Sequence, residues 1–253
     1  MTRRVRWITI FLLIAGAVFA GTGGYRLWSN HRLNSRGNRT VAEVIQQVRP
    51  AAEARLRPCF DQAGVPWPPP RAAFVAFKEE KRLELWAAKD GRWVFIRAYP
   101  ILAASGRAGP KLREGDGQVP EGIYRIVGLN PNSRFHLSLE LNYPNDFDRH
   151  KAAEDGRSNL GGEIFIHGKA VSIGCLAMGD EGIEDLFTLV HAVGLDNVQV
   201  LIAPRDLRGG QPPADLPTEP PWADELYATL RRQLQTFALP PAPSSSGVMP
   251  QNV

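Results

Sequence analysis

A histidine and a cysteine lie eight residues apart in one short stretch, residues 163–178, which reads EIFIHGKAVSIGCLAM. The pattern indicates a strand ending on His167, a loop of small residues, and Cys175 beside Gly174. A cysteine attacks as its thiolate, so it needs a base or a positive neighbour, and His167 can supply one. The backbone N–H groups of Gly174 and Cys175 in such a turn can stabilise an oxyanion. Spacing alone leaves open whether the pair is catalytic or whether the cysteine is buried and inert.

The chain has one other cysteine, Cys59, in very different surroundings. It follows Pro58 and precedes a proline-rich boundary at residues 66–70. A disulfide between the two cysteines would consume the proposed nucleophile, so we expect Cys59 to be structural. Residues that ligate metals do not cluster at convincing spacing, and we expect neither a metal nor another cofactor.

Most segments around this stretch have the residue pattern of β-strands. Short aliphatic and aromatic runs, separated by turn residues, predict strands at residues 73–77, 83–86, 93–98, 122–127, 135–141, 163–167 and 198–202. Loops are predicted at residues 105–120, 130–133 and 143–162, and one principal helix at residues 183–193, ended by Gly194. Many short strands with a single main helix predict a mainly β fold, a sandwich or barrel.

Other segments flank this core. Thr40 can cap a helix that Pro50 should interrupt, and residues 31–70 as a whole indicate a helical and proline-rich linker. The core is expected at residues 71–208, followed at 209–253 by a proline-rich tail with a short helix and a disordered end.

The first 30 residues have the pattern of an export signal. Arg3, Arg4 and Arg6 precede an uncharged run that extends to Gly24. The run suits either a cleaved signal peptide or an inner-membrane anchor, and the sequence leaves that choice open. We therefore expect an exported protein.

The charge of the chain does not indicate nucleic-acid binding. The calculated pI is 9.3, yet much of the excess comes from the N-terminal arginines, and no run of Lys or Arg follows. A membrane surface or an anionic wall polymer suits this modest positive balance at least as well.

Several segments together resemble one family. His167-Gly168 and Ser172-Ile173-Gly174-Cys175 resemble the active-site signature of the L,D-transpeptidase (YkuD-like) family. The stretches 109–111 (GPK), 115–118 (GDGQ), 120–124 (PEGIY) and 141–145 (LNYPN) resemble further segments of it. The resemblance covers roughly residues 72–204.

The resemblance implies a mostly β catalytic domain that attacks the peptide stems of peptidoglycan in the periplasm. Cys175 would form a thioester next to a diaminopimelate centre, and His167 would take and return the proton. The carbonyl of Gly168 would orient the imidazole, while Gly174 would serve the oxyanion and Ser172 would shape the loop.

Four further residues are candidates for substrate contact. Lys111 and Asp116 lie in a loop, where charged residues are more often simply solvated, and Asn142 and Tyr143 lie at a strand end, where they would line the cleft.

One departure from the family pattern bears on the reaction. The family usually has an arginine two residues after the cysteine, where this chain has Ala177. That difference and the short His-to-Cys spacing resemble the YafK-like branch, which is associated with hydrolysing the link between peptidoglycan and an outer-membrane lipoprotein. The resemblance therefore favours an amidase. The alternatives are a cross-linking transpeptidase and a non-catalytic peptidoglycan-binding protein.

Overall fold

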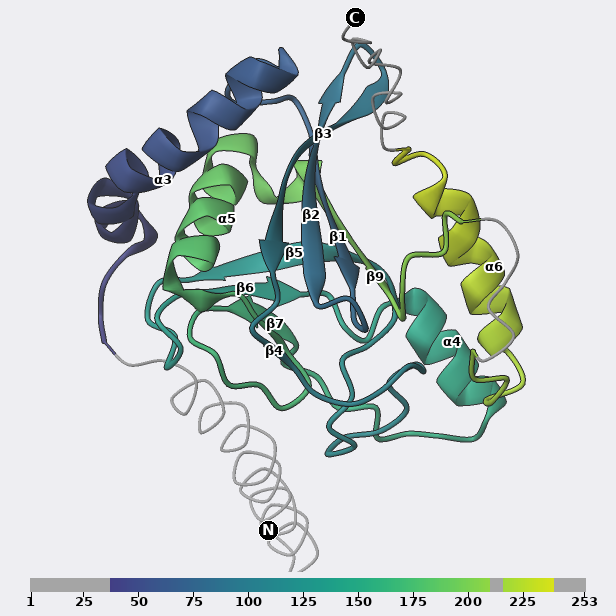
Figure 1. Cartoon of the computed structure of the whole chain (residues 1–253). Coiled ribbons are helices and arrows are strands. Elements are labelled where there is room, and N and C mark those ends of the chain that lie inside the picture. Colours follow the sequence, from purple (N-terminus) through teal and green to yellow (C-terminus); the bar gives the residue numbers. More distant parts are fainter. Residues whose placement is uncertain (1–36, 210–215, 239–253) are drawn as a thin grey trace, which may run out of the picture.

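The computed structural model describes residues 37–209 and 216–238 of the 253-residue chain. The predicted signal or anchor segment, residues 1–30, and the tail beyond residue 238 lie outside the described residues. Within the described ranges, no helix is both long and apolar enough to cross a membrane. Figure 1 shows a curved sheet with helices packed on both of its sides.

In the described part of the chain, nine strands form a single mixed sheet in the order β3-β2-β1-β9-β5-β6-β7-β8-β4. Their bounds are β1 Ala72–Phe77, β2 Arg82–Lys89, β3 Arg92–Pro100, β4 Ala103–Ala104, β5 Gly122–Asn130, β6 Ser138–Leu141, β7 Phe165–His167, β8 Leu176–Ala177 and β9 Val198–Ala203. The prediction of a mainly β fold is confirmed, and its form is one curved, half-closed barrel.

The parallel pair β1 and β9 lies inside the sheet, between β2 and β5. Every side chain of β1 is buried, because its sequence AAFVAF is apolar on both faces. Phe74 packs into the larger core and Phe77 into a second core on the opposite face. The strand therefore supports helices on both sides.

Strand β5 gives the sheet its bend. Its first half pairs with β9, and its second half pairs with β6, with a register shift in that pairing between Ile126 and Gly128. An irregularity of this kind bends the strand and increases its twist. The bend carries β6, β7 and β8 away from the plane of the first strands (Figure 1).

The helices are α3 Val41–Ala63, α4 Asp146–Glu154, α5 Gly179–Val193 and α6 Ala223–Leu234, with a 3₁₀ turn, η2, at Leu195–Asn197. Apolar residues of α3 and α5 share the larger core, and those of α6 belong to the second core. The predicted principal helix corresponds to α5, and the helix expected in the tail corresponds to α6.

The prediction that Pro50 interrupts the first helix was wrong. Helix α3 runs unbroken through Pro50 and Pro58, although an internal proline costs roughly 3 kcal/mol. A capping box between Thr40 and Glu43 fixes its start. Its buried face, which includes Leu56 and Phe60, packs in the larger core and offsets the cost.

Two local predictions need correction. Residues 143–162, expected to be a loop, contain α4, whose few apolar residues give no helical stripe but whose Asn145–Asp148 capping box marks its start. The strand expected at residues 135–141 begins only at Ser138, because His136 has a φ of +76°, which no strand residue adopts.

Candidate active site

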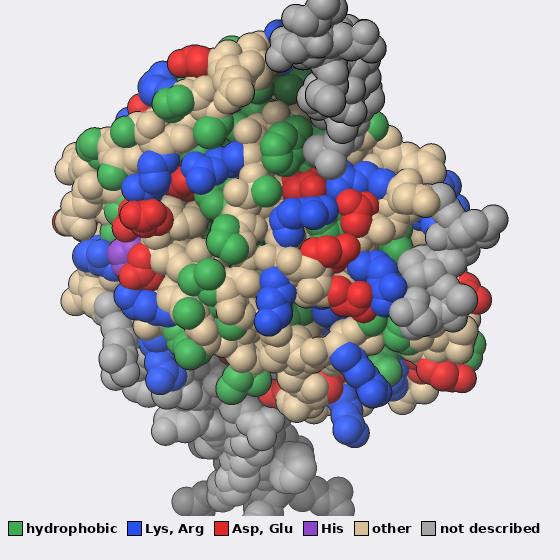
Figure 2. Space-filling model, viewed as in Figure 1, with side chains coloured by type: hydrophobic (Ala, Val, Ile, Leu, Met, Phe, Trp, Pro, Cys, Tyr) green, Lys and Arg blue, Asp and Glu red, His purple; other side chains and the backbone are tan. Residues whose placement is uncertain are grey.

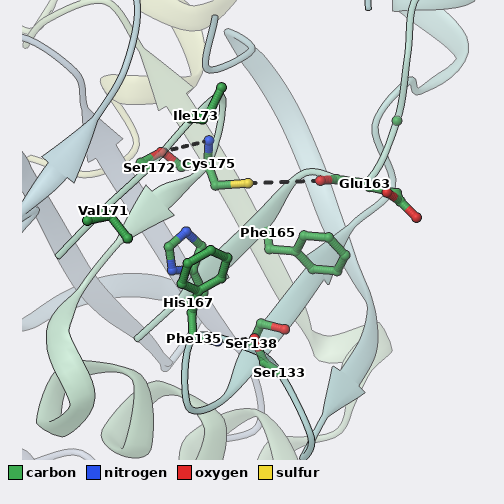
Figure 3. A pocket seen from close by; sticks show the side chains of 11 residues that line it. Ser133, Phe135, Ser138, Glu163, Phe165, His167, Val171, Ser172, Ile173 and Cys175 are labelled. Atoms are coloured by element: carbon green, nitrogen blue, oxygen red, sulfur yellow. Dashed lines mark hydrogen bonds between the residues drawn. The ribbon is translucent and has the colours of Figure 1, made fainter. Parts of the chain in front are cut away.

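Strand pairing brings His167 and Cys175 together. In the parallel pair β7 and β8, Ile166 lies opposite Leu176, and His167 lies opposite Ala177. Side chains alternate between the faces of a sheet, so Cys175, two residues before Ala177, points to the same face as His167. Figure 3 shows both side chains at one pocket.

The pocket has a volume of about 340 Å³. It is lined by Ser133, Phe135, Ser138, Gly162, Glu163, Phe165, His167, Val171, Ser172, Ile173 and Cys175. No lysine or arginine is among these residues, and Val171 and Ile173 are exposed at its rim. The wall around the sulfur is therefore mainly apolar.

His167 is buried and held in one orientation. Its Nδ1 lies 2.7 Å from the carbonyl oxygen of Gly168, as the resemblance implied. A carbonyl only accepts, so Nδ1 carries the hydrogen and Nε2 remains the basic nitrogen. Burial lowers the pKa of His167, with the hydrogen bond to Gly168 acting in the opposite direction. The imidazole is therefore predominantly neutral at pH 7.

Cys175 is a free thiol at the edge of the pocket. Its Sγ lies 3.9 Å from the carbonyl oxygen of Glu163, toward which Figure 3 shows it pointing. Burial raises the pKa of the Cys175 thiol. A thiol with a raised pKa would need a base to take its proton before it could act as a nucleophile.

Two serine hydroxyls fix the loop that carries Cys175. The Ser172 hydroxyl donates to the Cys175 carbonyl at 2.6 Å and accepts from the Cys175 N–H at 3.0 Å. The Gly174 N–H donates to the Ser105 hydroxyl at 2.5 Å, which in turn donates to the Gly117 carbonyl at 2.7 Å. Both predicted oxyanion donors therefore have hydroxyl partners in this conformation, and an oxyanion would have to compete with them.

Lys111 and Asp116 form a pair that organises their own loop. Lys111 Nζ lies 2.6 Å from Asp116 Oδ1 and donates to the Arg113 carbonyl at 2.9 Å. Asp116 also accepts from backbone N–H groups, including that of Gln118. Lys111 borders a second hollow of about 350 Å³, which shares Gly162, Glu163 and Ile173 with the first pocket. A substrate in that hollow would pass Lys111.

Asn142 and Tyr143 do not line the pocket. Asn142 Oδ1 accepts from the backbone N–H of Arg125 at 2.7 Å, next to the bend in β5. Tyr143 is buried, and its hydroxyl donates to the Leu160 carbonyl at 3.2 Å. Their hydrogen bonds belong to the scaffold around this pocket, and their contact with substrate stays a prediction.

Sequence reasoning missed Phe135 and Ser105. The ring of Phe135 stacks on His167, but the alternation of residues 135–141 indicated an ordinary strand. Ser105 lies 69 positions before Gly174, so nothing local indicated their contact. The next residue, His136, contacts Glu184 Oε1 through its Nε2 at 2.9 Å.

The remaining cysteine belongs to α3. The Cys59 thiol donates to the Arg55 carbonyl at 3.6 Å, one turn earlier in the helix, and its side chain packs against the larger core. Both cysteines are free. Across residues 37–209 and 216–238, no group of three or more His, Cys, Asp or Glu residues is arranged to hold a metal ion.

Comparisons with known proteins find a family model and relatives that match the part of the chain that contains the pocket. The family model described as "YkuD: L,D-transpeptidase catalytic domain" matches residues 71–202. "Putative L,D-transpeptidase YafK" of Escherichia coli K12 is 38% identical over 133 residues, which cover 51% of this chain and 52% of that relative. The chain thus matches about half the length of this curated relative.

Solved structures show a more distant likeness. The helical cell shape determining protein Pgp2 of Campylobacter jejuni is 23% identical with a TM-score of 0.45, covering 53% of this chain and 48% of that one. Bd1075 of Bdellovibrio bacteriovorus is 24% identical with a TM-score of 0.40, over 53% and 48% of the two chains.

Proposed function

We propose that this chain, which belongs to the L,D-transpeptidase catalytic-domain (YkuD) family, is a cysteine enzyme that acts on peptidoglycan stem peptides through a thioester on Cys175. The observation that carries the proposal is the shared pocket of Cys175 and His167, with the imidazole fixed by the Gly168 carbonyl. Covalent acyl transfer of this kind uses a thiol, an imidazole base and a group that orients the imidazole, and these three groups meet around one pocket.

The first step uses the neutral pair. Nε2 of His167 takes the thiol proton as the sulfur of Cys175 bonds to the carbonyl carbon of the scissile amide. The tetrahedral intermediate collapses, the carbon–nitrogen bond breaks, and the leaving amine receives the proton from His167. A thioester remains on Cys175, and the imidazole is neutral again.

The second step decides the product. If water is the acceptor, His167 removes its proton, the oxygen attacks the thioester carbon, and the thiol leaves with that proton. We favour hydrolysis because no Lys or Arg lines the pocket of Cys175 to hold the carboxylate of an amino-acid acceptor, and Lys111 of the adjoining hollow is already paired with Asp116. Position 177, where the family pattern has arginine, is a fully buried alanine opposite His167, so no guanidinium enters there. A cross-linking transpeptidase is the second candidate.

The substrate and compartment follow from the same proposal. An enzyme acting on peptidoglycan works outside the inner membrane, and the basic start and apolar run of residues 1–24 suit export to the periplasm. The proposed product is a protein or peptide released from diaminopimelate, including an outer-membrane lipoprotein, as the sequence resemblance to the YafK-like branch implies.

Intact-mass spectrometry with defined muropeptides tests the proposal. We expect a thioester adduct on the wild-type protein and on Cys59→Ser, and none on Cys175→Ala. Free stem peptide or released lipoprotein would indicate hydrolysis, and linked dimers would indicate transfer. Binding without adduct or product would contradict an enzyme and leave a peptidoglycan-binding protein.

A further inference from the structure

Residues 135–137 form a tight turn beside His167, which we call the His136 turn. The Leu137 N–H donates to the Phe135 carbonyl oxygen at 3.1 Å, and His136 between them has a φ of +76°. A three-residue turn with this hydrogen bond and positive φ is rare, and strained for any residue except glycine. Such a conformation persists only where surrounding contacts hold it in place.

The His136 turn makes one contact with His167 and two with its neighbour Gly168. The Phe135 ring lies on the imidazole, with 4.5 Å between ring centroids and 28° between planes. The Leu137 carbonyl accepts from the Gly168 N–H at 3.1 Å. The Phe135 carbonyl packs so closely on Gly168 that a Cβ there would lie 2.5 Å away. Since the Gly168 carbonyl holds Nδ1 of His167, movement of the turn would move the imidazole.

Charged contacts from two helices hold the turn. His136 Nε2 lies 2.9 Å from Glu184 Oε1 of α5, and the other carboxylate oxygen of Glu184 lies 3.3 Å from Arg55 of α3. Arg55 is fixed in turn by Asp185, whose carboxylate is buried and lies 2.8 Å from Arg55 Nε. The path from α3 to the turn is therefore continuous and made of partly buried groups.

The path begins outside the family segment. The family model matches residues 71–202, whereas Arg55 belongs to the preceding helix. His136 is not among the residues that line the pocket. Its side chain reaches the site only through the turn.

We propose that His136 is a positioning residue: anchored by Glu184 and Arg55, it holds the His136 turn against Gly168 and Phe135 against His167, so that helix α3 sets the orientation of the catalytic imidazole. This inference rests on the proposed role of His167 as base for Cys175. Helix α3, which lies outside the family segment, is thereby connected to the active site through the side chains of Arg55, Glu184 and His136.

The rate at which iodoacetamide alkylates Cys175, followed between pH 5 and 10, tests the inference without any peptidoglycan substrate. Peptide mapping separates Cys175 from Cys59. The full-length protein purified in detergent is compared with His136→Asn, which tolerates positive φ but shortens the reach to Glu184. Glu184→Ala removes the partner instead.

We expect both variants to alkylate Cys175 roughly tenfold more slowly at pH 7 and to show an altered pH profile, because a displaced base acts poorly. The double variant should be no slower than either single variant, since both break one linkage. Arg55→Ala should have the same effect in weaker form.

Matched controls come from the same helices. Glu181→Ala changes an exposed carboxylate on α5, and Arg57→Ala changes an exposed arginine on α3 that pairs with Glu53. Both should alkylate like the wild type. A lower melting temperature with an unchanged Cys175 profile in His136→Asn and Glu184→Ala would overturn the inference, because that result describes a merely structural contact. Should His136→Asn fail to fold, Glu184→Ala decides.

His167→Ala separates this inference from the proposed function. If alkylation of Cys175 does not depend on His167 at all, the proposed base is wrong, and the inference falls with it. If alkylation depends on His167 but not on His136, Glu184 or Arg55, only the positioning role is refuted.

Discussion

The ring of Phe135 covers one face of the His167 imidazole, at 4.5 Å between centroids and nearly parallel. The contact excludes water from the imidazole and contributes to the burial that lowers its pKa. A lowered pKa keeps the proposed base unprotonated to a more acidic pH than a free histidine allows. The stacking therefore bears on proton transfer as well as on packing.

Replacing Phe135 with leucine should move the acid limb of the activity profile. A leucine leaves the imidazole more hydrated, so the pKa of His167 should rise towards its usual range and more imidazolium should be present at mildly acid pH. A rise of one unit would lower kcat/KM roughly tenfold below that pKa. The pH dependence of kcat/KM measures the shift. Phe147→Leu is the control, because its ring packs on Trp222, away from the pocket. Equal profiles for the two variants would refute the prediction.

Gly168→Ala should destabilise the protein. The added Cβ would lie 2.5 Å from the Phe135 carbonyl oxygen and 2.8 Å from a carboxylate oxygen of Asp180, so the backbone must shift. Such overpacking costs typically about 1–3 kcal/mol, which chemical denaturation measures as a lower free energy of unfolding. Gly162→Ala is the matched control, since nothing lies within 4 Å of a Cβ placed there. Equal stability of the two variants would show that the His136 turn can shift away from residue 168 at little cost in free energy.

Asp148 should give the stability a distinct pH dependence. Burial raises the pKa of Asp148 to about 6 from 3.8. A raised carboxyl pKa means that the folded state holds the proton more tightly than the unfolded state. The stability that the protonated Asp148 carboxyl contributes is therefore complete below pH 3.8 and is lost as the pH rises through about 6.

Asparagine does not titrate, so Asp148→Asn should not lose stability as the pH rises. The melting temperature of the variant, measured relative to the wild type, should therefore increase between pH 4 and pH 7. Asp146→Asn, on the exposed side of the same helix, should show no such trend across that interval. If the difference in melting temperature between Asp148→Asn and the wild type stays constant between pH 4 and pH 7, Asp148 is not a buried carboxyl that titrates in this range.

The parts of the site that could be predicted were implied by the resemblance to the family, and their contacts are local in sequence. The contact of His167 with the Gly168 carbonyl and the hydrogen bonds of Ser172 within its own loop involve neighbours at most three residues apart. Apolar runs likewise predicted the principal strands, because a strand buried on both faces has little choice of residue.

The missed features depend on contacts that residue type does not reveal. The positive φ of His136 is held by Glu184, 48 residues further along the chain, so local alternation indicated a strand instead. Helix α3 continues through Pro50 because distant apolar residues cover its face. Tertiary packing in both cases overrides the local preference.

The pairing of β1 with β9 has a consequence for how the molecule folds. These central strands come from the two extremes of the family segment, with Ala72 beside Val198. Contacts between such distant residues carry a large loop-closure entropy and slow the folding of a domain. The hairpin of β1 and β2 can form from neighbouring residues, but β1 and β5 join one sheet only when β9 pairs with both of them. A chain truncated before Val198 would lack the strand on which both cores are built, so the pocket of Cys175 cannot form until β9 has joined the sheet.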